Sequence, residues 1–156
     1  MSETAASQPQ PHFNIEKVYV KDLSVEVPHA PAIFLERDTP RIDLQLNNES
    51  APVGEGLFEV TITAVVTAKL KDKVVFLVEA KQAGIFRIQN VAQAELEGVL
   101  AGVCPNILFP YLREVVSESS VRAGFLPVLL SPIDFGALHA VQQRQAQARA
   151  AAATAH

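Results

Sequence analysis

The residue best suited to covalent chemistry in this chain is its single cysteine, Cys104, which stands before Pro105 in the stretch CPNILFPYLRE. A thiol at the start of a helix can have a lowered pKa, which favours the nucleophilic thiolate. A cysteine enzyme also needs a general base. Two of the four histidines lie near the chain ends, His29 stands between prolines, and only His139 lies in a predicted helix. We therefore interpret Cys104 as a structural residue at a helix start, with a nucleophile as the alternative.

Other kinds of chemical site find little support in the residue spacing. No CxxC, HxxxH or HExxH pattern offers a set of metal ligands. The stretch GEG at 54–56 is not followed by Lys-Ser or Lys-Thr, so it does not form a phosphate-binding loop. The acidic pairs Asp22/Glu26 and Glu95/Glu97 are typical of a solvated surface. The residue patterns thus predict no enzyme, no metal site and no cofactor.

The composition indicates one soluble globular domain with short tails. The chain has 156 residues, of which 49% are hydrophobic and 19% are charged. The net charge is −4, and no basic patch with interleaved aromatics appears, so nucleic acid is not an expected partner. Uninterrupted apolar runs are too short to insert into a membrane, and the first residues do not resemble a secretory signal. Together with the single cysteine, this predicts a cytoplasmic location.

Alternation of apolar and polar residues predicts four strands and one antiparallel sheet. The alternation in the first strand shifts near Lys17 and Val18, which indicates a bulge. A tight turn at 71–73 joins the last two strands into a hairpin. The predicted strands cover residues 13–27, 41–47, 57–70 and 74–88.

Three helices are predicted after the strands. The first covers residues 90–102. The second begins with Cys104 near the N-cap and Pro105 at the first helical position, where the missing N–H does no harm. Pro110 predicts a kink in this helix, and Gly124 its end.

The third helix is expected to begin with Ser131 as N-cap and Pro132 at the first position. The predicted fold class is therefore α+β, a four-stranded antiparallel sheet with helices on one side. We expect a disordered arm at residues 1–11, one domain at 12–142, and a flexible Ala/Gln/Arg-rich tail at 143–156.

Two surpluses of apolar residues point to binding rather than catalysis. The fourth strand begins apolar on both faces, with Phe76 and Val78 on one side and Val75 and Leu77 on the other. This pattern favours packing between subunits over a two-sided core within one chain. The irregular segments AIFL (32–35) and FLPVLL (125–130) are either lids of the core or walls of a groove for extended chains.

Four motifs resemble the bacterial protein-export chaperone family SecB. They are AGVCPNILFPYLRE (101–114), GIFRI (84–88), KDLSVEVPHAP (21–31) and PVLLSPIDFGALH (127–139). The resemblance covers about residues 12–142, in order. It implies a homotetramer, built as a dimer of dimers, that binds unfolded precursor proteins without ATP. Such a chaperone keeps precursors competent for translocation and hands them to the SecA translocation ATPase.

Matching positions within the resemblance imply three sets of site residues. The set expected to contact the basic, zinc-bearing C-terminal segment of SecA is Asp22, Glu26, Leu77 and Glu79. The set tied to subunit association is Val78, Ala80 and Gln82. The residues expected to contact client proteins are Phe34, Leu44, Leu46, Phe125, Leu126, Val128, Leu129, Phe135 and Leu138.

A second function is compatible with the same resemblance. A SecB-like body can serve a single toxin–antitoxin client instead of many precursors, and a neighbouring toxin gene would favour that function. The sequence departs from the family pattern in being less acidic than is common, with two arginines and no acid in its last sixteen residues.

Overall fold

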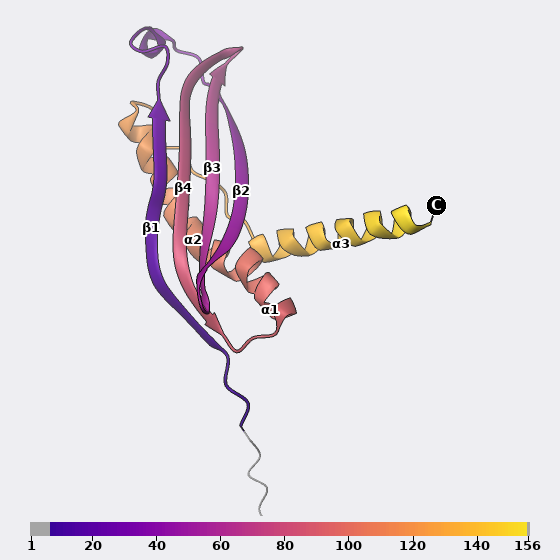
Figure 1. Ribbon diagram of the computed structural model, residues 1–156. Coiled ribbons are helices and arrows are strands. Elements are labelled where there is room, and N and C mark those ends of the chain that lie inside the picture. The colour runs from indigo at the N-terminus through magenta and orange to yellow at the C-terminus, as the bar shows by residue number, and fades with distance from the viewer. Residues whose placement is uncertain (1–6, 156) are drawn as a thin grey trace, which may run out of the picture.

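The computed structural model describes residues 7–155, and its core is a four-stranded antiparallel sheet with helices on one side (Figure 1). The strands are β1 (His12–Glu26), β2 (Arg41–Gly54), β3 (Leu57–Leu70) and β4 (Lys73–Gln89). Their order in the sheet is β1-β4-β3-β2, so β1 and β2 are the edge strands. The predicted α+β class is confirmed. Part of the predicted N-terminal arm, residues 1–6, lies outside the described residues.

The edge strand β1 contains two bulges, of which the sequence analysis predicted one. Its register with β4 shifts between Ile15 and Lys17 and again between Val20 and Asp22. Each shift moves the following side chains to the opposite face of the sheet. The apolar residues of β1 change from odd to even and back to odd positions, so the two bulges keep them on one face. These residues are Phe13, Ile15, Val18, Val20, Leu23 and Val25.

The other edge strand, β2, is longer than predicted. The sequence predicted it for residues 41–47, but pairing with β3 continues to Gly54, with Pro52 opposite Phe58. Most of β2 is exposed. An edge strand that is solvated on both faces does not need the alternation by which strands are recognised, because its backbone pairing with one neighbour is sufficient.

One continuous helical run replaces the two helices predicted between 90 and 124. It consists of α1 (Gln93–Gly98), the π-helical turn η2 (Val99–Val103) and α2 (Cys104–Arg122). Cys104 has helical backbone angles, so its predicted N-cap role is wrong. Pro105 has no N–H to donate to the carbonyl of Ala101 four residues earlier. The side chain of Asn48 in β2 donates to that carbonyl at 3.2 Å, which explains how the helix passes the proline.

The core lies between α2 and the two central strands. Leu108, Leu112 and Val116 of α2 are fully buried against the β3 and β4 side chains. By length and composition alone the run Gln93–Arg122 could cross a membrane, although the sequence contains no uninterrupted apolar run of that length. Its apolar side chains are those that cover the sheet, as in the core helix of many globular proteins.

The last helix, α3 (Phe135–Thr154), begins three residues later than predicted. Its N-cap is Asp134, whose carboxylate accepts a hydrogen bond from the N–H of Ala137 at 3.1 Å. Gly136 of α3 meets Gly102 so closely that a Cβ on Gly102 would lie 2.9 Å from the Gly136 Cα. Beyond this contact α3 projects away from the sheet (Figure 1). It crosses the predicted domain boundary at 142–143 and stays helical to Thr154.

Candidate functional site

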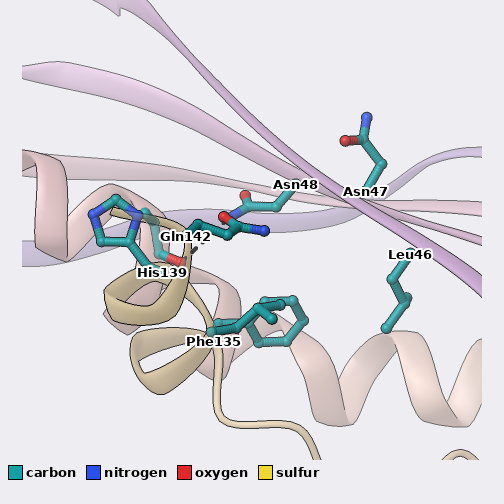
Figure 2. Close-up of a pocket in the computed structure, with 8 residues that line it drawn as sticks. Leu46, Asn47, Asn48, Phe135, His139 and Gln142 are labelled. Atoms are coloured by element: carbon teal, nitrogen blue, oxygen red, sulfur yellow. Dashed lines mark hydrogen bonds between the residues drawn. The ribbon is translucent and has the colours of Figure 1, made fainter. Parts of the chain in front are cut away.

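Two cavities lie beside β2, and a third adjoins one of them at the segment that follows α2. We call the three together the β2 groove. The α3 cavity, about 370 Å³, lies between β2 and the start of α3 (Figure 2). The loop cavity, about 400 Å³, lies between the start of β2 and residues 125–129. The η1 cavity, about 250 Å³, lies beside the short 3₁₀ helix η1 (Ala32–Leu35).

The edge strand forms one wall of the β2 groove. Ile42, Leu44 and Leu46 share the face of β2 that looks toward the helices, because they pair with Ala68, Val66 and Ala64 of the buried β3 face. The helix α2 crosses β3 and β4, so this face of β2 keeps exposed apolar surface. Figure 2 shows Leu46 on the side of Phe135, while Asn47 points the opposite way.

The opposite wall is the irregular segment 125–134, which is held against α2 at both ends. Gly124 ends α2 with a positive φ of 96°, a conformation that favours glycine. The hydroxyl of Ser120 accepts a hydrogen bond from the N–H of Val128 at 2.9 Å, and the side chain of Asn106 accepts one from the N–H of Phe135 at 2.9 Å. This anchoring leaves Leu126 and Leu129 exposed at 86% and 64%.

The predicted client residues fall on the β2 groove. Eight of them line a cavity, namely Phe34, Leu46, Phe125, Leu126, Val128, Leu129, Phe135 and Leu138. Leu44 lies between Ile42 and Leu46 on the same face of β2. Phe135 is only 3% exposed and packs against Phe109, so it contributes mainly to the core. Their role in client binding stays a prediction.

Sequence analysis missed several residues of the groove. Ile42 lines the loop cavity, and its alternation with Leu44 and Leu46 could have revealed it. Asn48 continues the same alternation as a polar residue on the helix-side face, where its side chain binds the carbonyl of Ala101. Phe76, His139 and Gln142 also line cavities, but only the tertiary fold brings these three to the groove.

The four residues expected to dock SecA lie together on the outer face, the sheet face turned away from α2. Glu26 pairs with Leu77 across β1 and β4, and Ser24 pairs with Glu79. Cross-strand partners point to the same face, so Asp22 joins them beside Lys81. None of the three ion pairs found within residues 7–155 involves Asp22, Glu26 or Glu79. The structure therefore brings three carboxylates and an apolar side chain together, and their docking role stays a prediction.

A separate polar cluster on the outer face ties β1 to β3 across β4. Lys21 donates to the Glu59 carboxylate at 2.6 Å, and the Tyr19 hydroxyl donates to its second oxygen. The hydrogen bond from Lys21, then that from Tyr19, lowers the pKa of Glu59 below its ordinary value. Burial and the hydrogen bond to Glu59 raise the pKa of Tyr19 to about 12. The depressed carboxyl pKa means that the stabilisation is present at neutral pH and is lost as the pH falls through that pKa.

The three predicted subunit-contact residues are buried inside the protomer. Val78, Ala80 and Gln82 are at most 2% exposed, on the face that α2 covers. Gln82 donates to the carbonyl of Tyr19 at 3.1 Å, and its own oxygen has no partner within the described residues. A second subunit would not touch these side chains directly in this conformation. Their interface role stays a prediction that would have to act through neighbouring residues.

Those neighbours are exposed apolar residues of β1. Val25, Leu23 and Val20 pair directly with Val78, Ala80 and Gln82. They belong to a row that we call the β1 stripe, formed by Phe13, Ile15, Val18, Val20, Leu23 and Val25. Apart from the partly buried Val18, its members are 42–47% exposed. A contiguous apolar row of this kind on an edge strand is typical of a contact surface.

Cys104 does not have the surroundings of a catalytic nucleophile. Its side chain is fully buried in the core beside Leu108. Burial raises the pKa of the Cys104 thiol to about 12, so the thiol is protonated at neutral pH. Within residues 7–155, no three His, Cys, Asp or Glu side chains gather where they could hold a metal ion.

We expect Cys104 to react very slowly with a thiol reagent in the native protein. A rise in pKa from 9.0 to about 12 lowers the thiolate population about a thousand-fold, and burial blocks access as well. The measurement is the rate of reaction with a chromogenic disulfide at pH 8, in buffer and in denaturant. Equal rates in the two conditions would contradict the buried position, and a Cys104→Ser variant provides the baseline.

Comparison with known proteins places this architecture in a family. The family model described as "Preprotein translocase subunit SecB" matches residues 6–147. The chain is 54% identical to the protein-export protein SecB of Methylobacillus flagellatus, over 99% of this chain and 98% of that one. It is 60% identical to the protein-export protein SecB of an Azoarcus species, over 86% of this chain and 89% of that one.

A solved structure supports the same fold. A SecB-like chaperone of Mycobacterium tuberculosis, in complex with a peptide from an antitoxin, superposes with a TM-score of 0.63 over 78% of this chain and 88% of that one. The sequence identity is 19%, so this likeness concerns the fold alone. The family model and the relatives extend over nearly the whole chain, and the chain therefore belongs to the SecB family of protein-export proteins.

Proposed function

We propose that this protein is a cytoplasmic chaperone that binds unfolded precursor proteins without ATP and keeps them competent for translocation. The observation that carries the proposal is the β2 groove, in which apolar side chains stay exposed on a segment held firmly against α2. Membership of the SecB family supports the same function. No step of this function requires a nucleotide, because the groove binds by apolar burial alone.

The groove suits an extended polypeptide better than a compact ligand. Its cavities follow successive residues of β2, from Ile42 in the loop cavity to Leu46 in the α3 cavity. The loop cavity is lined by apolar side chains apart from Thr39. Apolar contacts at repeated positions recognise an unfolded chain with little dependence on its sequence. A folded protein buries the side chains that such a groove would bind.

The proposal includes assembly into a tetramer, built as a dimer of dimers. The β1 stripe supplies exposed apolar surface at one edge of the sheet, opposite the β2 groove. Self-association through a two-fold axis would bury two copies of the stripe at once. Because assembly would use the β1 edge of the sheet, the β2 edge stays free for clients.

A refolding assay tests the holding function. A slowly folding precursor is diluted from denaturant without nucleotide, and recovery of its folded signal is followed with and without this protein. We expect refolding to stop at about one tetramer per precursor, and a precursor that is already folded to be unaffected. Undisturbed refolding at excess protein would remove the general holding function.

Delivery to SecA is proposed to use the acidic outer face. Asp22→Lys combined with Glu26→Lys is expected to weaken binding to SecA at least about tenfold, since two attractions become repulsions. Client holding should not change, because both side chains lie on the sheet face opposite the β2 groove. Titration calorimetry with SecA gives the affinity, and Asp43→Lys combined with Glu49→Lys on β2 serves as a charge-matched control. Unchanged affinity in the double variant would remove the docking assignment.

A second candidate function is holding one dedicated toxin–antitoxin client. It is favoured by one observation, that the SecB-like chaperone of similar fold was solved with an antitoxin peptide. The greater identity to export proteins, 54% and 60%, favours the export function. Arrest of many unrelated unfolded precursors in the refolding assay would support the export function and contradict a single dedicated client.

A further inference from the structure

The aromatic ring of Phe125 is packed between two other rings at the centre of the β2 groove. Its centroid lies 5.2 Å from that of Phe34 in a stacked arrangement, and 4.7 Å from that of Phe76 in a tilted one. Phe76 is fully buried in the sheet, whereas Phe34 is 48% exposed on η1. The three rings come from three separate parts of the chain. Their geometry is that of favourable aromatic pairs.

Phe125 also lines two of the cavities. It lines the loop cavity together with Phe76, and it lines the η1 cavity together with Phe34. The cavities, of about 400 and 250 Å³, share Pro40, Phe125 and Leu126 in their linings. Of these three, Phe125 is the aromatic residue, and its ring packs against both Phe34 and Phe76.

The hydrogen bonds around Phe125 hold its backbone and not its ring. The residue follows Gly124 and belongs to no helix or strand. Its N–H donates to the carbonyl of Ser120 at 3.1 Å, and the next anchors are Val128 and the buried Leu130. A side-chain rotation can therefore expose the ring without breaking a strand or helix hydrogen bond.

We propose that Phe125 occupies, in the free protein, the place that an aromatic client side chain takes between Phe34 and Phe76. The inference rests on the proposed holding function and adds to it an internal competitor. The aromatic ring of a client enters only when the Phe125 side chain rotates toward solvent. Part of the free energy of client binding is therefore used to displace Phe125. In the free protein the space between Phe34 and Phe76 is filled by Phe125, and client chains without aromatic side chains gain nothing from displacing it.

The test uses two peptides that differ at one side chain. A fluorescently labelled, unstructured peptide carries either Phe or Ala at its centre, and its affinity for the full-length protein is measured by anisotropy. We expect Phe125→Ala to raise the preference for the Phe peptide over the Ala peptide about tenfold relative to the unaltered protein, because the client ring no longer competes. Val53→Ala, which shortens an exposed side chain outside the groove residues, should leave the preference unchanged.

Two outcomes of the peptide experiment would contradict the proposals, and they differ from each other. If Phe125 is a fixed wall, Phe125→Ala will bind the Phe peptide more weakly and the preference will fall, which overturns the proposal. If the unaltered protein binds neither peptide and also fails to arrest precursor refolding, the proposed function fails instead. The two failures therefore have different signatures.

A second measurement covers the case in which Phe125→Ala does not fold. The unaltered sequence is labelled with 4-fluorophenylalanine, and the Phe125 signal is identified by its absence in Phe125→Leu. We expect the Phe peptide, and not the Ala peptide, to move this fluorine signal toward the value of a solvent-exposed ring. A signal that stays in place when the Phe peptide is bound overturns the proposal.

Discussion

Leu129→Asp is expected to remove most of the client-holding activity while leaving the protein folded. Leu129 is 64% exposed in the loop cavity, so its substitution opens no cavity in the core. A carboxylate at this position would have to lose its hydration whenever a client covered it, without a partner charge. We expect at least a tenfold loss of affinity for an unfolded precursor.

The refolding assay and a thermal melt decide this prediction together. Leu35→Asp is the matched control, because Leu35 is 84% exposed but lines none of the three cavities of the β2 groove. The variant Leu129→Asp should melt like the unaltered protein and fail to arrest refolding, while Leu35→Asp should arrest it normally. A large fall in melting temperature would mean that Leu129 belongs to the core. Normal arrest would mean that clients bind elsewhere.

Leu23→Asp combined with Val25→Asp is expected to break the assembly into smaller species. Both side chains lie in the β1 stripe, at 46% and 42% exposure, on the helix-side face of β1, where Leu23 also borders a small cavity beside Val115 of α2. Burying one such aliphatic side chain contributes about 1.5–3 kcal/mol, and symmetry repeats the contact in each partner. Two buried and unpaired carboxylates per subunit would oppose association by several times that amount.

The mass in solution gives the answer, measured by light scattering on a size-exclusion column. The unaltered protein is expected at the mass of four chains of 16.9 kDa, and the double variant at one or two chains. Val53→Asp, also an exposed aliphatic position on an edge strand, should not change the mass. An unchanged mass in the double variant would exclude the β1 stripe from the interface. A single-chain mass for the unaltered protein would refute the assembly itself.

The strands could be predicted because their residues face a core. Alternation located β3 and β4 within one residue at either end, since apolar side chains there must point inward. The end of β2 was missed because exposed edge residues are under no such constraint. In β1 the second bulge leaves a trace in the sequence, a return of the apolar residues to odd positions at Leu23, but only the register with β4 shows it as a bulge.

The predicted helix boundaries were wrong where a side chain far away in the sequence provides a hydrogen bond to the helix backbone. Pro105 indicates a helix start, yet the carbonyl that it leaves unpaired is bound by Asn48, more than fifty residues earlier. No local signal could reveal this partner. The same applies to α3, because the segment from Ser131 to Asp134 is not helical and the first helical residue, Phe135, is fixed by Asn106 of α2.

By itself the sequence determined the family, the fold class, and the apolar segments from which a groove could be built, because motifs and alternation are properties of the chain. Only the tertiary structure decided which of those residues are exposed. It buried Val78, Ala80 and Gln82, exposed their partners Val25, Leu23 and Val20, and brought Phe76 to Phe125 and Phe34. Exposure depends on which elements cover one another, and here α2 covers the two central strands and leaves both edges open.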